Sequence, residues 1–248
     1  MPITTRTEDV SGDGGVMEIY VAEPRQVGAG TCPVVIVFME AFGVNGHIKE
    51  VTDRFANEGY LAIAPDMYYR NGKGIVVGYN EIPKVMPLMQ SMNDVQTNAD
   101  TRIAIDFAKG LEKARADRIG CVGYCMGGTL SWMAACLNRD IKAASVYYTG
   151  GLITRETSAR RPLSPHEYAS LLTAPVLGNF GQDDQNPTPA DVQQVDAELS
   201  KLWKVHDFKI YPGAGHGFSC NDRPSYHQAS ADDAWARTLA WFGKYLKG

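Results

Sequence analysis

The chain has 248 residues, of which 44% are hydrophobic and 21% are charged, as is usual for a folded globular protein. Its 24 basic and 28 acidic residues leave a net charge of -4, so no excess of positive charge is available to neutralise nucleic-acid phosphates. The sequence contains no run of about 18 apolar residues, the length that a membrane-spanning helix needs. We therefore expect neither nucleic acid nor a membrane as a partner.

The cysteines and histidines exclude other classes of site. Five cysteines are an odd number, which suits free thiols in a reducing cytoplasm better than a disulfide framework. The first 15 residues lack the basic-then-apolar order of a signal peptide, so we expect a cytoplasmic protein. The five histidines show no HxxxH or HExxH spacing and no CxxC pair occurs, so the sequence predicts no metal site.

The first half of the chain begins with a predicted hairpin, in which residues 3–10 and 16–22 flank the turn-rich SGDGG. Residues 33–40, PVVIVFME, form an apolar run typical of a strand that is buried on both faces. A helix over 47–58 and a short strand over 61–64 follow. Glycines and prolines repeatedly interrupt residues 67–93, which we interpret as an irregular excursion that could border a site.

The second half alternates regularly between predicted strands and helices. Thr188, Pro189 and Asp191 supply an N-cap, a proline in the first turn and an acid in the first turn, which together mark a helix start. In chain order we expect a helix over 94–116, strand 119–124, helix 126–138, strands 142–148 and 175–180, a helix from 188 to about 203, strand 208–211 and helix 225–246.

This order of elements predicts an α/β fold. Alternating strands and helices form a mostly parallel central sheet with helices on both faces, and the N-terminal antiparallel hairpin extends one edge. No repeat or linker divides the chain, so we expect a single domain over residues 1–248. In such sheets the site lies at the carboxyl ends of the strands.

The segment Gly-Tyr-Cys-Met-Gly-Gly at 123–128 lies between a predicted strand and a predicted helix. It matches the G-x-S-x-G nucleophile elbow of the α/β-hydrolase fold, with Cys125 in place of serine. The helix that follows would direct its N-terminal N–H groups at the sulfur and so favour a thiolate and an oxyanion. The alternative is a buried cysteine that only packs in the core.

The expected base and acid follow in the order that this fold requires. His216 lies in the glycine-rich GAGHGF, directly after the last predicted strand. Asp183 and Asp184 follow the strand that ends at Phe180, and either carboxylate could hold the tautomer of the imidazole. The alternatives are a solvated loop histidine and aspartates that only cap a turn.

The loop after the long apolar strand completes the predicted site. In this fold that loop donates one backbone N–H to the oxyanion hole, which makes Ala41 one donor and Met126, after the nucleophile, the second. Glu40 precedes Ala41, and a carboxylate this close to a nucleophile must be held by a partner or be partly neutral. A strand-end acid at the surface is the alternative for Glu40.

Five segments together resemble the dienelactone hydrolase (carboxymethylenebutenolidase) family of α/β-hydrolases. They are MEAFGVNGHI at 39–48, GYLAIAPDMYYR at 59–70, GYCMGG at 123–128, FGQDDQNP at 180–187 and GAGHGF at 213–218. The resemblance implies a Cys-His-Asp triad of Cys125, His216 and Asp184, the family's spacing selecting Asp184. It also implies that Glu40 contacts the resting thiol and takes part in forming the thiolate when substrate binds.

The resemblance implies as well that arginines hold the carboxylate of a lactone substrate. The family places one of them four residues after the histidine, where this chain has Cys220. Arg223 and Arg70 are the two candidates to replace it, with surface charge as the alternative for both. The sequence leaves the oligomeric state open.

These expectations together predict a carboxylic ester hydrolase that cleaves a small lactone or ester through a thioester on Cys125, without a metal or organic cofactor. One alternative is the hydrolysis of other small esters or thioesters on the same fold. The other belongs to a different class: a redox-responsive or ligand-binding protein with little turnover, since a reactive exposed thiol also suits a sensor.

Overall fold

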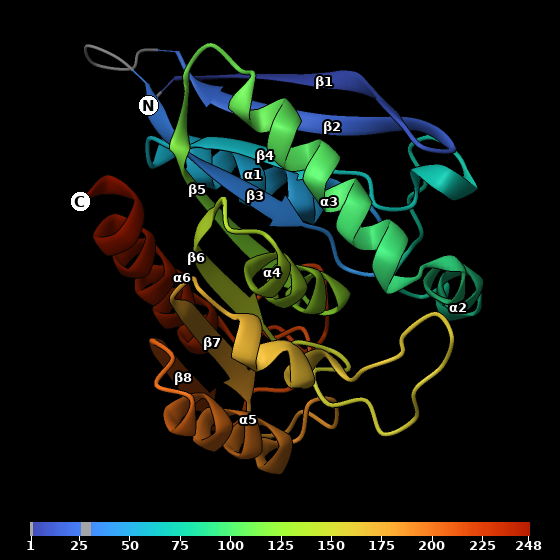
Figure 1. The fold of residues 1–248 in the computed structure, drawn as a ribbon, viewed down its shortest axis with the longest axis vertical. Coiled ribbons are helices and arrows are strands. Elements are labelled where there is room, and N and C mark those ends of the chain that lie inside the picture. The colour runs from blue at the N-terminus through green and yellow to red at the C-terminus, as the bar shows by residue number, and fades with distance from the viewer. Residues whose placement is uncertain (1, 26–30) are drawn as a thin grey trace. The chain divides into compact units, whose positions relative to one another are not determined.

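The computed structural model describes residues 2–25 and 31–248 of the chain (Figure 1). The chain divides into two compact units, Met1–Gly120 and Cys121–Gly248. The single domain expected from the sequence stays a prediction.

The first unit is built on the predicted hairpin. Strands β1 (Ile3–Gly12) and β2 (Gly15–Pro24) pair antiparallel from Ile3 opposite Pro24 to Gly12 opposite Gly15. Strand β2 pairs antiparallel with β4 (Leu61–Pro65), and β4 pairs parallel with β3 (Cys32–Phe38). All residues of β3 and β4 are buried, as expected for apolar runs covered on both faces.

Two helices cover opposite faces of these strands, with α3 (Asp94–Lys109) in front and α1 (Gly46–Asn57) behind in Figure 1. The Asn45 side chain caps α1 by accepting from the Ile48 N–H at 3.1 Å, and Asn93 caps α3 by accepting from the Gln96 N–H at 2.9 Å. Both caps satisfy N–H groups that a helix start leaves without a partner.

The structure corrects two expectations in this unit. Residues 67–93 are not wholly irregular, because they contain a short 3₁₀ turn (Tyr69–Asn71) and helix α2 (Ile82–Ser91). Pro83 stands in the first turn of α2, where a missing N–H costs nothing, so the proline did not exclude a helix. Helix α3 ends at Lys109 rather than 116, because Gly110 follows as its C-cap and the chain then extends into β5.

The second unit continues from β5 (Ala114–Tyr124), whose residues are shared between the two units. Its strand order is β5, β6 (Ile141–Tyr147), β7 (Val176–Gly181) and β8 (His206–Tyr211), with β6, β7 and β8 paired in parallel. Helix α4 (Met126–Leu137) lies on one face of β6, while α6 (Gln228–Phe242) lies behind β6 and β7 (Figure 1).

Helix α5 (Pro189–Lys201) packs on β7 and β8, and it starts as the sequence predicts. Thr188 and Asp191 form a capping box, in which each side chain accepts from the backbone N–H of the other. The predicted α/β fold, with a mostly parallel sheet and an antiparallel N-terminal hairpin, is confirmed.

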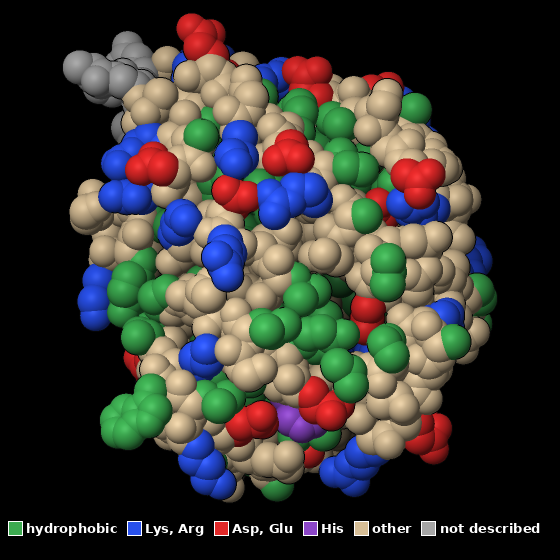
Figure 2. All heavy atoms as spheres, viewed as in Figure 1, with side chains coloured by type: hydrophobic (Ala, Val, Ile, Leu, Met, Phe, Trp, Pro, Cys, Tyr) green, Lys and Arg blue, Asp and Glu red, His purple; other side chains and the backbone are tan. Residues whose placement is uncertain are grey.

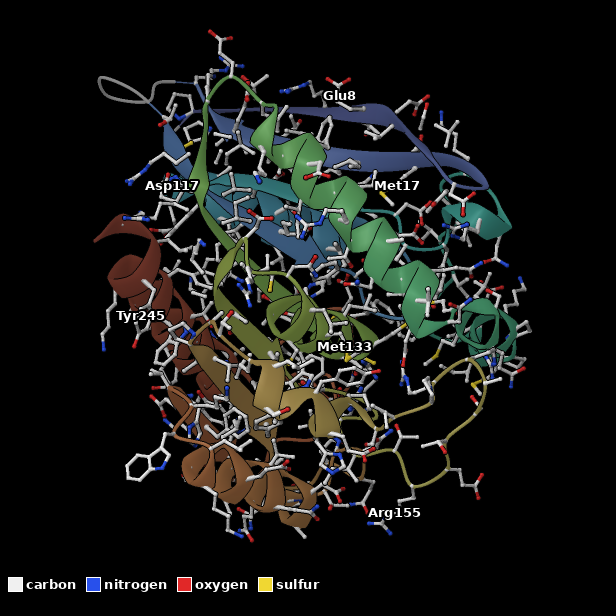
Figure 3. The ribbon with its side chains drawn as sticks, in the orientation of Figure 1. Glu8, Met17, Asp117, Met133, Arg155 and Tyr245 are labelled. Carbon is white, nitrogen blue, oxygen red and sulfur yellow. The ribbon has the colours of Figure 1, made fainter. Side chains whose placement is uncertain are left out.

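Surface side chains follow the expected chemistry. Figure 2 shows basic and acidic side chains interspersed on the face it presents. Figure 3 shows Arg155 and Tyr245 pointing outward from the second unit, whereas Met17 of β2 and Met133 of α4 are buried.

Among the described residues, none of the helices has the length and apolar character to cross a membrane.

Candidate active site

The candidate site of the second unit centres on Cys125, at the corner between β5 and α4. Cys125 has φ 56° and ψ -118°, a backbone conformation that residues other than glycine rarely adopt. Such a conformation costs about 1–3 kcal/mol. Its N–H donates to the Tyr147 carbonyl at 3.1 Å, and its carbonyl accepts from Gly128 at 3.0 Å and from Gly150 at 3.2 Å. These bonds hold the strained corner in place.

The glycines beside Cys125 are required by close approach. A Cβ on Gly123 would lie 1.8 Å from the Gly127 carbonyl oxygen, which is inside the first turn of α4. A Cβ on Gly128 would lie 2.7 Å from the Thr149 hydroxyl. Only glycine therefore lets the strand, the corner and the helix approach this closely. The N-terminus of α4, beginning with Met126, is brought next to the sulfur.

The acid and the histidine come from the loops after β7 and β8. Gly181 ends β7, and a Cβ there would lie 2.3 Å from the Ala214 carbonyl oxygen, so its lack of a side chain lets the two loops touch. The Asp183 N–H donates to that same carbonyl at 2.9 Å. The loop that carries the acid is thus packed directly on the loop that carries His216.

The structure brings together the three residues predicted to form a triad. His216 Nδ1 lies 2.9 Å from Asp184 Oδ2, and Cys125 is within hydrogen-bonding reach of the same imidazole. The Asp184 side chain is 1% exposed, whereas Asp183 is exposed. Asp184 is therefore the aspartate that contacts His216, as the family resemblance implied, where the residues by themselves left both open.

The charges of this cluster favour a protonated imidazole. Burial by itself lowers the pKa of His216, but the hydrogen bonds with Asp184 and Cys125 outweigh it and raise the pKa from 6.5 to about 10. The Asp184 carboxylate on one side and the Cys125 sulfur on the other both stabilise the imidazolium. The arrangement therefore places a proton donor beside the sulfur.

Three further residues around this cluster were not singled out from the sequence. Tyr148 follows β6 with φ 33°, and its ring meets the His216 ring edge-on with centroids 5.2 Å apart. A Cβ on Gly150 would lie 3.9 Å from both the Cys125 carbonyl carbon and His216 Cε1. Asn186 donates its N–H to Asp184 Oδ1 at 2.9 Å. A Gly-Gly pair directly after a predicted strand, at 150–151, is the signal that could have drawn attention to this turn.

The two arginines proposed from the sequence lie in different units. Arg223 lies against the histidine loop, since a Cβ on Gly217 would be 2.4 Å from its Nη1. Arg70, in the first unit, makes two hydrogen bonds to the buried Asp100, from Nε at 3.1 Å and from Nη2 at 2.8 Å. Asp100 thus holds two of the three guanidinium nitrogens of Arg70. A role in binding substrate stays a prediction for both.

Glu40 and Ala41 belong to the first unit, where they follow β3. Glu40 is fully buried and accepts a hydrogen bond from the Tyr79 hydroxyl at 3.2 Å. The Ala41 carbonyl accepts from the Tyr68 hydroxyl at 3.1 Å. The alternative of a surface acid is therefore wrong for Glu40, while thiol activation by Glu40 and oxyanion binding by the Ala41 N–H stay predictions.

Metal-ligating groups are not gathered anywhere in the described residues, which contain no cluster of three or more His, Cys, Asp or Glu arranged to hold an ion. All five cysteines are free thiols, and four of them are buried. Cys125 is the partly exposed one. A partly exposed thiol beside an imidazole is a group that can act as a nucleophile, and this role stays a prediction for Cys125.

Comparisons with known proteins identify the family of this chain. The profile of the dienelactone hydrolase family matches residues 17–246. A candidate carboxymethylenebutenolidase of Methylorubrum extorquens is 37% identical over 232 residues, covering 93% of this chain and 78% of the relative. One of Escherichia coli K12 is also 37% identical, over 237 residues that cover 95% of this chain and 85% of the relative.

A solved structure shows the same arrangement of the chain. The crystal structure of a candidate dienelactone hydrolase from Klebsiella pneumoniae is 35% identical, with a TM-score of 0.91, over 99% of this chain and 100% of the other. The match extends over the strands and helices that carry both the predicted nucleophile and its partners. The chain belongs to the dienelactone hydrolase family, a family of carboxylic ester hydrolases with the α/β-hydrolase fold.

Proposed function

We propose that the protein hydrolyses a small lactone or ester of the dienelactone type, with Cys125 as the nucleophile and a thioester as the intermediate. The observation that carries the proposal is the position of His216, which has the buried Asp184 carboxylate on one side and the Cys125 sulfur on the other. A base oriented by an acid and in contact with a nucleophile is the arrangement that acyl transfer needs.

In the first step the Cys125 thiolate attacks the carbonyl carbon and forms a carbon–sulfur bond, and the carbonyl oxygen takes the negative charge. The Met126 N–H, at the start of α4, and the Ala41 N–H are the proposed oxyanion donors, each worth about 3 kcal/mol in comparable sites. The tetrahedral intermediate then breaks its carbon–oxygen bond. The leaving alkoxide or enolate takes the proton of the His216 imidazolium.

In the second step water hydrolyses the thioester. Neutral His216 removes a proton from the attacking water, whose oxygen bonds to the acyl carbon. The carbon–sulfur bond breaks, the carboxylic acid leaves, and the Cys125 thiolate with the His216 imidazolium is restored. Asp184 holds the imidazole in the tautomer that these transfers need. In this proposal Glu40 helps to form the thiolate when substrate binds.

A carboxylate on the substrate would be bound by an arginine. Arg223 is the candidate in the second unit because its guanidinium lies beside the residue that follows His216. Arg70 is the candidate in the first unit, although Asp100 already holds it. We expect Arg223→Ala to raise the KM for a carboxylate-bearing dienelactone and to leave the KM for a neutral aryl ester unchanged. A cytoplasmic location, suggested by the free thiols, is part of the proposal.

The test combines turnover with trapping of the intermediate. Wild type should hydrolyse a dienelactone and acid quenching should leave an acyl group on Cys125, detected by peptide mass spectrometry. Cys125→Ala should lose turnover and the acyl group. Cys136→Ala removes a buried thiol from α4, the helix that Cys125 precedes, and should keep both. Turnover that persists in Cys125→Ala would refute the nucleophile.

A panel of substrates separates this proposal from its alternatives. Dienelactone, aryl esters and acyl thioesters are compared by kcat/KM, because discrimination is a difference in transition-state binding. A preference for thioesters or simple aryl esters would replace the lactone with those substrates. Oxidation of Cys125 by peroxide, without any hydrolysis across the panel, would favour a redox-responsive protein instead.

A further inference from the structure

The loop between β6 and the 3₁₀ segment Pro165–Leu171 is hydrogen-bonded to the loop that carries Asp184 through the Asn186 side chain. The Gly151 N–H donates to Asn186 Oδ1 at 2.9 Å. Asn186 lies two residues after Asp184, in the loop after β7. Farther along the first loop, the Arg155 side chain is 81% exposed and its Nη2 lies 3.5 Å from Asp191 Oδ1 (Figure 3).

We infer that Asn186 is a positioning residue, which ties the acid loop to the Gly150–Gly151 turn and thereby fixes Asp184 and Cys125 around His216. This inference rests on the proposed function. The sequence pattern did not select Asn186, and its role is distinct from the three triad residues because it touches neither the thiol nor the imidazole in the bonds described above.

Both carboxylate oxygens of Asp184 are hydrogen-bonded. Oδ2 contacts His216 Nδ1, and Oδ1 accepts from the Asn186 N–H, each at 2.9 Å. With one oxygen held by the backbone, the carboxylate cannot rotate freely away from the imidazole. The position of the Asn186 backbone therefore sets the orientation of the acid.

The Gly150–Gly151 turn is also hydrogen-bonded to Cys125 and to helix α4. The Gly150 N–H donates to the Cys125 carbonyl at 3.2 Å, and the Gly150 carbonyl accepts from the Thr129 hydroxyl of α4. The Gly150–Gly151 turn is thus bonded both to Cys125 and to Thr129 of α4. Because the next N–H, that of Gly151, is bonded to Asn186, the corner and the acid loop are connected.

These bonds form a closed circuit. It passes from Cys125 to Gly150, along the chain to Gly151, across to Asn186, back to Asp184, and through His216 to Cys125. Every member is in the second unit. The Asn186 side-chain oxygen is the one side-chain acceptor in this circuit outside the triad. It joins two loops that follow different strands, so its loss opens the circuit without removing a reacting group.

The test uses two substitutions at the same position. Asn186→Ala removes the acceptor for Gly151, whereas Asn186→Asp keeps an oxygen in its place. We expect Asn186→Ala to lower kcat about fivefold, which is about 1 kcal/mol at 1.4 kcal/mol per tenfold, with KM within about twofold. Asn186→Asp should restore kcat to within about twofold of wild type. Gln185→Ala removes an exposed amide from the same loop and should behave as wild type.

A second readout separates positioning from a general loss of structure. The pH profile of Cys125 alkylation by iodoacetamide should change in Asn186→Ala. The limb assigned to His216 should move to lower pH, because an Asp184 carboxylate that is held less firmly raises the pKa of His216 less. Thermal unfolding, measured alongside, should be similar in Ala and Asp variants. This readout does not require a substrate.

The outcomes distinguish this inference from the proposed function. Wild-type kinetics and alkylation in Asn186→Ala would overturn the inference, and so would equal losses in the Ala and Asp variants, since the acceptor oxygen would then be irrelevant. A wild-type protein that hydrolyses none of the panel would overturn the proposed function instead. In that case the alkylation profile still decides whether Asn186 positions the cluster.

Discussion

Replacing Gly123 by alanine tests whether the corner that carries Cys125 depends on close approach. The added Cβ would lie 1.8 Å from the Gly127 carbonyl oxygen, 2.2 Å from the Gly127 carbonyl carbon and 2.8 Å from the Gly128 nitrogen. All three atoms are backbone atoms of α4, so rotation of a side chain cannot relieve the overlap. The first turn of the helix has to move away from β5.

The size of that movement follows from the same distances. Cβ contacts below 3.0 Å are essentially never tolerated, so the Gly127 oxygen must retreat by at least about 1.2 Å. Overpacking of this kind costs about 3 kcal/mol, which lowers the Tm of a chain of this size by about 6–12 °C. A displacement of about 1 Å between reacting groups costs on the order of a hundredfold in rate.

The assay measures Tm by circular dichroism and kcat on an activated ester for the same preparations. Gly243→Ala is the matched control, because Gly243 has helical φ -55° and ψ -47° and its Cβ would meet nothing within 4 Å. It should keep its activity and gain a little stability, as alanine does at helical positions. A Gly123→Ala protein with wild-type Tm and kcat would refute the steric argument.

Three other predictions follow from the charges of the two units. Asp184→Asn should lower kcat by about a thousandfold or more and move the His216 limb of the pH profile to lower pH, because the carboxylate that raises this pKa is lost. The pKa of His216 is raised from 6.5 to about 10 on folding, so its contribution to stability is complete below pH 6.5 and is lost as the pH rises towards 10. Urea unfolding should show this loss, and His216→Asn should reduce it. Asp100→Ala should destabilise the protein by about 3 kcal/mol in urea unfolding, because it leaves the guanidinium of Arg70 without its buried partner.

Each of these predictions has a result that contradicts it. An unchanged pH profile in Asp184→Asn would mean that this carboxylate does not control the imidazole. An equal decline in stability from pH 6.5 to 10 in wild type and His216→Asn would assign the decline to other groups. Asp106 lies on the same helix as Asp100, but its side chain is 61% exposed, so Asp106→Ala is the control for Asp100→Ala. Equal effects of the two aspartate variants would exclude the buried pair as the cause.

Local signals in the sequence were sufficient for much of the fold. The hairpin at the N-terminus, the buried run of β3 and the capping of α5 by Thr188 each depend on residues close together in the chain. The end of α3 also has a local signal, the C-cap Gly110, which the predicted helix ran past. The apolar spacing of Ile103, Phe107 and Leu111 continued the predicted helix too far, whereas the chain turns at Gly110 and extends as a strand.

The candidate site divides in the same way. The sequence by itself determined the strand–helix corner at Cys125, because glycine spacing and strand–helix order are local, and it determined that His216 follows the last strand. The residues by themselves left Asp183 and Asp184 open and the family resemblance implied Asp184, which the tertiary structure shows against His216. Only the tertiary structure decided that Asn186 joins the acid loop to the turn at Gly150. The physical reason is that a hydrogen bond between two loops depends on how neighbouring strands align, which pairing across the sheet sets and no single segment encodes.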